Sequence, residues 1–139
     1  MPLTLFAFAT PPALACSIPP PPPMTEAEKA AEAEKYRQAF LDRGRNSEAI
    51  VRVKALSSSG YGEGRALVKV LKTLRGKAQR GAIINLKTID TGMCGWGDLK
   101  RGERGIIILD KERPRFFKGF LHELDLQEYR KAGILPPED

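Results

Sequence analysis

The chain is poor in the residues that build metal and nucleophile sites. It has one histidine, His122, and two cysteines, Cys16 and Cys94, in 139 residues. A structural zinc site takes about four nitrogen or sulfur ligands, which are hard to assemble from this set. No motif typical of a serine or cysteine nucleophile is present either. We therefore expect no cofactor, no metal of the protein's own and no enzymatic activity.

Long apolar runs are also absent. No apolar stretch reaches the length of about 18 residues at which a membrane span is predicted. The first charged residue is Glu26, and the chain as a whole carries 23 lysines and arginines against 17 acidic residues, a net charge of +6. This excess attracts anionic partners such as nucleic acid, lipopolysaccharide or acidic protein surfaces, but it does not indicate a fold.

Residues 1–15 have the pattern of a signal peptide. A short apolar run, Leu3 to Ala9, precedes the small residues Ala13 and Ala15, which form an A-x-A cleavage site. Cleavage after Ala15 leaves Cys16 as the first residue of a secreted, periplasmic or cell-envelope protein. No lysine or arginine precedes Cys16, so the usual positively charged start of such a leader is missing. Cleavage before a cysteine is also how lipoproteins are made, and in that alternative Cys16 carries a lipid anchor.

The two cysteines form a natural pair in an exported protein. In an oxidising compartment, two cysteines in a small domain most simply bond to each other, which predicts a disulfide between Cys16 and Cys94. The lipoprotein alternative excludes this pairing because it uses the sulfur of Cys16.

The amino-terminal third is predicted to be an extended segment followed by a helix. Residues 16–24 include five consecutive prolines, which favour a stiff polyproline II conformation. Residues 25–44 are rich in Ala, Glu and Lys, with Thr25 and Glu28 spaced as a capping box and Gly44 placed to end the helix. Three residues recur at helical spacing and form the expected docking stripe: Ala33, Tyr36 and Phe40.

Residues 48–139 are predicted to form a β-domain. Apolar and polar residues alternate over 50–55 and 66–71, a pattern typical of two strands joined as a hairpin. Further strands are expected at 82–88, at 105–109, whose continuous apolar run indicates burial on both faces, and at 116–122. Asp125 and Glu128 then have the spacing of a capping box for a short helix that ends at Gly133. Five short strands and a terminal helix fit a mainly β fold, a five-stranded OB-type barrel, in one domain spanning 16–139.

The chain resembles the netrin-like domain of the tissue inhibitors of metalloproteinases. The start Cys16-Ser17-Ile18-Pro19-Pro20 is similar to the family's mature amino terminus, and Met93-Cys94-Gly95-Trp96 is similar to the segment whose cysteine pairs with that first residue. Ile50 to Ala55, Val70 to Gly76 and Gly105 to Asp110 resemble barrel strands of the family. The chain departs from the family at Ile18, where a second cysteine is usual, and in having no cysteine-rich half after the barrel.

The resemblance implies a mode of protease inhibition. In the family, the α-amino group and carbonyl of the first cysteine bind the catalytic zinc of a protease, and the second residue enters the adjacent pocket. An α-amine with a pKa of roughly 8 is partly unprotonated near neutral pH and can occupy the open position of a catalytic zinc. The implied contact ridge consists of Cys16, Ser17, Ile18, Pro19, Thr91, Gly92, Met93 and Cys94. The alternative is that Cys16 and Cys94 form only a structural cross-link.

Three function classes therefore remain open. The first is an exported, monomeric netrin-like binding module with a protein partner, for which a zinc metalloprotease is one candidate. The second is a nucleic-acid-binding OB fold, favoured by basic residues on or near strands: Arg52, Lys54, Lys69, Lys72, Lys87 and Arg101. We expect nucleic acid less than protein, because the strands interleave lysine with valine and leucine and not with the aromatic residues on which bases stack. The third class, an enzyme, has no positive support.

Overall fold

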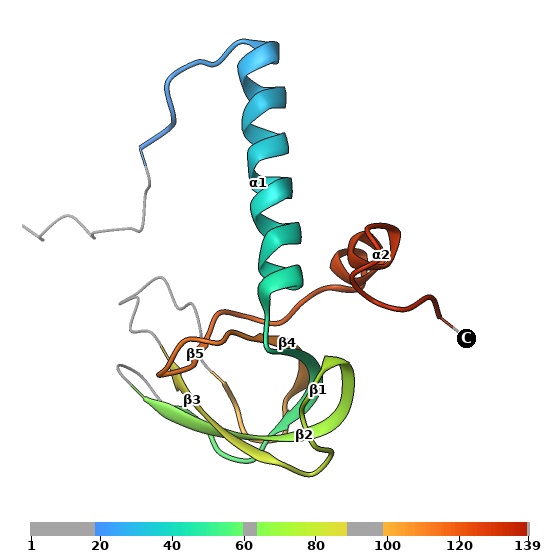
Figure 1. The fold of residues 1–139 in the computed structure, drawn as a ribbon. Coiled ribbons are helices and arrows are strands. Elements are labelled where there is room, and N and C mark those ends of the chain that lie inside the picture. The colour runs from blue at the N-terminus through green and yellow to red at the C-terminus, as the bar shows by residue number, and fades with distance from the viewer. Residues whose placement is uncertain (1–18, 60–63, 89–98, 139) are drawn as a thin grey trace, which may run out of the picture.

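A curled β-sheet and two helices make up the part of the chain that the structure describes (Figure 1). The structure, a computed structural model, describes residues 19–59, 64–88 and 99–138. Its elements in chain order are α1 (Glu26–Asn46), β1 (Ala49–Ala55), β2 (Arg65–Gly76), β3 (Ile83–Thr88), β4 (Arg104–Leu109), β5 (Phe116–Phe117) and α2 (Glu123–Lys131). The fold is mainly β, as the strand patterns predicted, and the sheet has the shape of a half-barrel.

The five strands form one sheet in the order β4-β1-β2-β3-β5. Neighbours are antiparallel except for β3 and β5, which run parallel. An isolated bridge joins Ile106 of β4 to Leu121, beyond β5, and so brings the two edges of the sheet toward each other. The curl of the sheet encloses an apolar interior.

Apolar side chains at every second position of the strands fill this interior. The buried residues Val51, Val53 and Ala55 of β1 face Val68 and Val70 of β2, and the interior also receives every second residue of β3 and β4. Strand β4 is buried on both faces, as its continuous apolar run predicted. Ile107 and Leu109 point into the barrel, whereas Ile106 and Ile108 belong to a second apolar cluster.

The second cluster covers the outer face of β1 and β4. It joins Ile50, Ile106 and Ile108 to Leu41 of α1 and to residues of α2 and the tail that follows it: Leu126, Tyr129, Ile134 and Leu135. Both helices therefore pack on the same outer part of the sheet, which leaves the outer face of β2 and β3 for solvent or a partner.

Helix α1 stands out from the barrel along most of its length (Figure 1). Its start is as predicted, because the Thr25 hydroxyl accepts from Glu28 N–H and the Glu28 carboxylate accepts from Thr25 N–H. Residues 26–39 are exposed, so the expected docking stripe is wrong for Ala33 and for Tyr36, which is 68% exposed. Only the last two turns dock, through Phe40, Leu41 and Gly44.

Gly44 has a different role from the one predicted. The helix passes through it and ends at Asn46, so Gly44 is not the stop signal. The ring of Tyr129 lies against its backbone, and a Cβ at this position would come within 2.5 Å of Tyr129 Cε1. Glycine is required here by close packing, a tertiary contact that helix rules do not contain.

Two predictions near the carboxyl end are wrong in detail. The strand expected over residues 116–122 is limited to Phe116–Phe117 and the bridge at Leu121. The second helix begins earlier than predicted, with His122 as its N-cap, and Asp125 is its third residue. The Asp125 carboxylate accepts from His122 N–H at 2.8 Å, so Asp125 does cap the helix but does so from inside it.

No helix within the described ranges is long and apolar enough to cross a membrane.

Candidate functional site

Most residues of the predicted contact ridge lie outside the described part of the chain. These are Cys16, Ser17, Ile18, Thr91, Gly92, Met93 and Cys94. Pro19 is described and is exposed, in an extended segment that leads into the far end of α1. The predicted disulfide and the ridge therefore remain predictions.

A basic surface lies on the outer side of β1 and β2. Because Val51, Val53 and Ala55 point inward, the intervening Arg52 and Lys54 point outward. On β2, Lys69 and Lys72 are exposed. We call Arg52, Lys54, Lys69 and Lys72 the basic sheet face.

The register places like charges directly opposite one another. Lys54 faces Lys69 on β2 and Arg104 on β4, and Arg52 faces Lys72 on β2. Like charges at directly facing positions of an antiparallel sheet are destabilising. The arrangement therefore costs stability in the free protein, and an anion bound over these side chains would relieve that cost.

Acidic residues are absent from the strands that carry this surface. Strands β1 to β4 contain no Asp or Glu, and all their charged residues are basic: Arg52, Lys54, Arg65, Lys69, Lys72, Arg75, Lys87 and Arg104. Of the carboxylates that the structure describes, none lies within ion-pair distance of the basic sheet face. The positive charge of this face is thus unneutralised by the described parts of the chain.

Carboxylates near the barrel ends pair with other basic residues. Glu48 accepts from Arg115 at 2.7 Å and from Arg113 at 3.0 Å, and the hydrogen bond from Arg115 is the main cause that lowers the pKa of its carboxyl. Burial alone would raise the pKa of Asp110, but hydrogen bonds and charge from Arg43 and Lys118 outweigh it and lower the pKa. These two acids hold α1 and the β5 region to the barrel and are not available to the basic sheet face.

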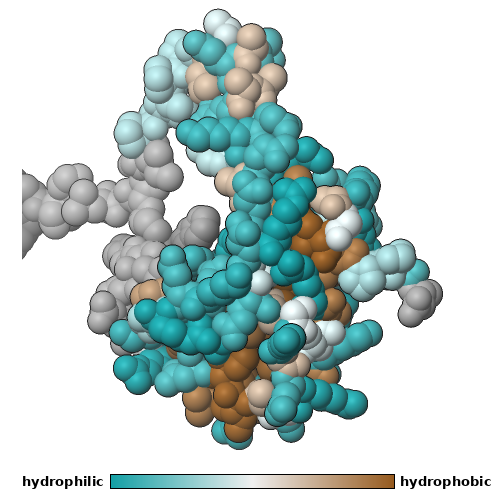
Figure 2. Space-filling view, in the orientation of Figure 1, coloured by the Kyte–Doolittle hydropathy of each residue, from teal (hydrophilic) through white to brown (hydrophobic). Residues whose placement is uncertain are grey.

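Aliphatic residues, and not aromatic ones, accompany the basic sheet face. Leu67 of β2 is 41% exposed and Ile83 of β3 is 61% exposed. Figure 2 shows hydrophobic surface over the lower part of the barrel, where Figure 1 shows β2 and β3, within a largely hydrophilic face. Strands β1, β2 and β3 contain no Phe, Tyr or Trp.

The structure separates the six basic residues singled out from the sequence. Arg52, Lys54, Lys69 and Lys72 form one face, whereas Lys87 lies at the β3–β5 pairing and Arg101 lies in an exposed turn. Sequence reasoning missed Arg104, which directly precedes the apolar run of β4 and completes a row of three cations with Lys54 and Lys69.

His122 is exposed at the start of α2. Among the described residues, no group of three or more His, Cys, Asp or Glu side chains could hold a metal ion.

Comparisons of the chain with protein-family models, with curated proteins and with solved structures found no match.

Proposed function

We propose that the chain is an exported binding module built on an OB-type barrel, and that the basic sheet face binds an acidic protein surface. The observation that carries this proposal is the row of like charges at facing strand positions, Lys69, Lys54 and Arg104. A fold keeps such a row at a cost in stability, which binding of an anionic partner would offset. Export to the periplasm, the cell envelope or the medium rests on the A-x-A site at Ala13 and Ala15.

The sheet topology supports the OB assignment. The order β4-β1-β2-β3 is that of a Greek key, in which a fourth strand returns to lie beside the first. An OB fold is a five-stranded, partly open Greek-key barrel, and the parallel pairing of β5 with β3 supplies the fifth strand. The bridge between Ile106 and Leu121 favours closure of the sheet into such a barrel.

The composition of the face favours protein over nucleic acid. Proteins that bind single strands combine a positive groove with aromatic side chains on which bases stack. The exposed apolar residues beside the basic sheet face are Leu67 and Ile83, which cannot stack on bases. Basic and aliphatic side chains together suit a protein surface that presents carboxylates around an apolar patch.

A binding assay with two labelled polyanions tests this proposal. The first is a fluorescent peptide of glutamate residues, and the second is a thymidine oligonucleotide of equal charge. The variant carries Lys54→Glu with Lys69→Glu. A matched control carries Lys35→Glu with Lys111→Glu, which lie outside the sheet and change the net charge equally.

We expect the peptide to bind the unaltered protein at low salt and the strand variant to lose this binding, while the control retains most of it. Binding should weaken steeply as salt rises, because the attraction is between exposed charges. Equal loss in the variant and in the control would contradict a localised site. A tighter, salt-resistant complex with the oligonucleotide would favour the nucleic-acid class instead.

Inhibition of a zinc metalloprotease by the mature amino terminus is a second candidate. Figure 1 shows residues 19–25 turning back from the far end of α1 toward the level of the barrel. The exposed part of α1, residues 26–39, is about 21 Å long at 1.5 Å per residue. The ten residues from Cys16 to Thr25 make nine steps, which would span about 28 Å in a polyproline II conformation, longer than the exposed part of α1, so the predicted bond to Cys94 is compatible with this length.

The test compares the form that begins at Cys16 with a form that carries one additional alanine before it. If the free α-amine binds the catalytic zinc, only the first form inhibits proteases in a panel of zinc metalloproteases, because the extension removes the amine. Failure of both forms across the panel would leave Cys16 as a structural cross-link. The binding assay on the basic sheet face is independent of this outcome.

A further inference from the structure

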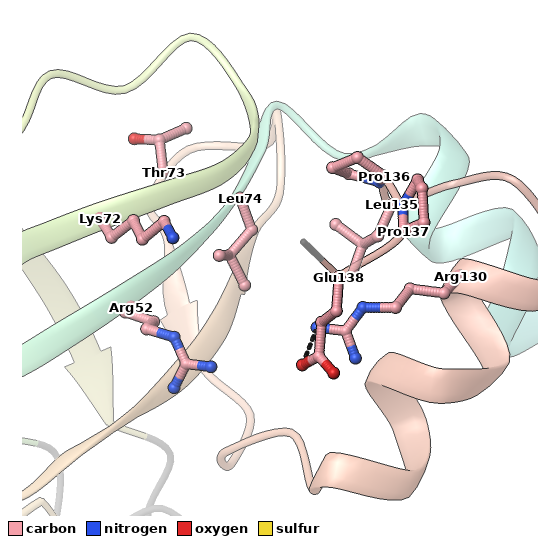
Figure 3. Close-up of a pocket in the computed structure, with 9 residues that line it drawn as sticks. All are labelled: Arg52, Lys72, Thr73, Leu74, Arg130, Leu135, Pro136, Pro137 and Glu138. Carbon is pink, nitrogen blue, oxygen red and sulfur yellow. Dashed lines mark ion pairs between the residues drawn. The ribbon is translucent and has the colours of Figure 1, made fainter.

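A cleft separates the outer face of the sheet from the carboxyl-terminal segment (Figure 3). It encloses about 480 Å³ and lies between β1 and β2 on one side and α2 with its following tail on the other. This volume is within the range of small-molecule sites, roughly 300 to 1,000 Å³. The cleft is therefore large enough for an organic ligand.

Three cations from three elements line the cleft. Figure 3 shows Arg52 of β1 and Lys72 of β2 reaching toward it from the sheet, with Arg130 of α2 opposite. Arg52 and Lys72 face each other across the two strands. Neither has an ion-pair partner among the residues that the structure describes.

One carboxylate lies in the cleft, on the tail of the chain. Glu138 Oε1 accepts from Arg130 Nη2 at 3.0 Å, and the side chain of Glu138 is 71% exposed whereas that of Arg130 is 19% exposed. Because the Glu138 side chain is exposed and lies on the tail, this ion pair contributes little stability. The tail carboxylate is therefore easily displaced and leaves Arg130 directed at the cleft.

The remaining wall is largely apolar. Leu74 of β2 approaches from the sheet, and the buried Leu135 and two exposed prolines, Pro136 and Pro137, approach from the tail. The cleft thus combines cations on two facing sides with an apolar wall, a combination that suits an organic anion better than an inorganic ion.

We propose that this cleft binds a phosphate monoester with an apolar organic group. Arg52, Lys72 and Arg130 bind the phosphate oxygens, because guanidinium groups make paired hydrogen bonds to phosphate and an ammonium adds a point charge. Leu74 and Leu135 contact the organic group. Glu138 competes with the phosphate for Arg130 and so weakens binding until the tail moves away. The cleft shares Arg52 and Lys72 with the basic sheet face, but the phosphate proposal does not rest on the proposed acidic protein partner, whose test uses Lys54 and Lys69.

Calorimetric titration with phenyl phosphate, on the full mature chain, tests the proposal. The site variant carries Arg52→Gln with Lys72→Gln. A control variant carries Lys35→Gln with Lys111→Gln, which removes the same charge outside the cleft. We expect the site variant to bind about tenfold more weakly or worse, because it loses charge-assisted hydrogen bonds, and the control to bind within about twofold of the unaltered protein.

Glu138→Gln has the opposite expected effect. Removal of the competing carboxylate should tighten phenyl phosphate binding about two- to fivefold, in line with the strength of an ion pair whose acidic partner is exposed. Undetectable binding, equal weakening in the site and control variants, or weaker binding by Glu138→Gln would each overturn the proposal. Circular dichroism of each variant shows whether the fold is intact.

Two further ligands distinguish the source of the phosphate. Inorganic phosphate should bind more weakly than phenyl phosphate, because it lacks the apolar group, and equal affinity would contradict the role of Leu74 and Leu135. Vesicles that contain phosphatidic acid are then compared with neutral vesicles. Vesicle binding that the site variant loses and the control keeps supports a lipid headgroup as the source, whereas vesicle binding that both variants keep counts against this cleft.

Discussion

Lys54→Glu should stabilise the folded protein. Lys54 lies between two cations, Lys69 on β2 and Arg104 on β4, and faces each of them directly in the sheet. Replacement by glutamate converts two repulsive pairs into two attractive ones. It leaves the buried neighbours Val53 and Ala55 untouched, because side chains alternate across a strand.

The magnitude follows from the strand geometry. Facing Cα atoms in an antiparallel sheet lie about 5 Å apart, and the charged ends of long side chains lie further apart, at roughly 6 Å. Two unit charges at that distance in water interact by about 0.7 kcal/mol, and about 0.1 M salt reduces this to roughly 0.4 kcal/mol. Reversal of the sign in two pairs gives a gain of about 1.5 kcal/mol, and Lys54→Gln should give about half of it.

Thermal unfolding followed by circular dichroism measures this effect. For a domain of this size a gain of about 1.5 kcal/mol corresponds to a rise in Tm of roughly 4 to 8 °C. In about 1 M salt, where the Debye length is about 3 Å, most of the gain should vanish. Lys111→Glu, at an exposed loop position, changes the net charge equally and serves as the control.

Three results would refute this reasoning. A Tm that does not rise would mean that the facing cations do not repel each other measurably. A gain that persists in high salt would have a cause other than charge, and an equal gain in Lys111→Glu would come from net charge alone.

Further tests address packing, pH, α1 and the cysteines. Tyr129→Phe should lower the free energy of unfolding by about 1 kcal/mol, because the phenol donates a hydrogen bond of 3.0 Å to the backbone of α1. Burial raises the pKa of Tyr129 to about 12, above its ordinary value of 10.0, so the protein should lose stability as pH rises from about 10 to 12, and Tyr129→Phe should flatten this part of the pH profile in denaturant titrations. Gly44→Ala should destabilise by about 1 to 3 kcal/mol in the same titrations, because the new methyl group meets the ring of Tyr129; a stabilised variant would contradict the packing. In a background with Cys16→Ala and Cys94→Ala, which removes the predicted disulfide from both forms, a chain that begins at Gln38 should keep its Tm within a few degrees of the longer chain, since residues 26–39 are exposed; loss of cooperative unfolding would show that the omitted part contributes to the core. Thiol titration of the denatured, unreduced protein should find no reactive thiol, and two per chain would exclude a bond between Cys16 and Cys94.

Local patterns in the sequence were enough to predict β1 to β4 and the start of α1, though not the extent of β5. Val51, Val53 and Ala55 alternate with basic residues because one face of β1 is buried, and the continuous apolar run of β4 marks burial on both faces. The Thr25 capping box is likewise a contact within four residues. Strand alternation and helix capping depend on residues that are close together in the chain, so both can be read directly from the sequence.

Contacts between distant residues were decided only by the tertiary structure. Gly44 reads as a helix stop in the sequence, yet it serves to let Tyr129, far along the chain, pack against α1. The last two turns of α1 dock on the outer face of β1 and β4, so the stripe of Ala33 and Tyr36 above them meets no part of the barrel.

The candidate sites likewise combine local features that the sequence predicts with contacts between distant residues that only the fold brings about. The sequence by itself determined that Arg52 and Lys54 lie on the face of β1 opposite to Val51 and Val53, because alternation assigns each residue of β1 to a face. It did not determine that Lys54 faces Lys69 and Arg104, since pairing register depends on which strands become neighbours. Nor did it bring Arg130 and Glu138 opposite Arg52 and Lys72, because that placement requires α2 to pack across the outer face of the sheet. The charge of each residue and the alternation of apolar residues can be read from the chain. Which charged side chains come together is decided only when the strands and α2 pack.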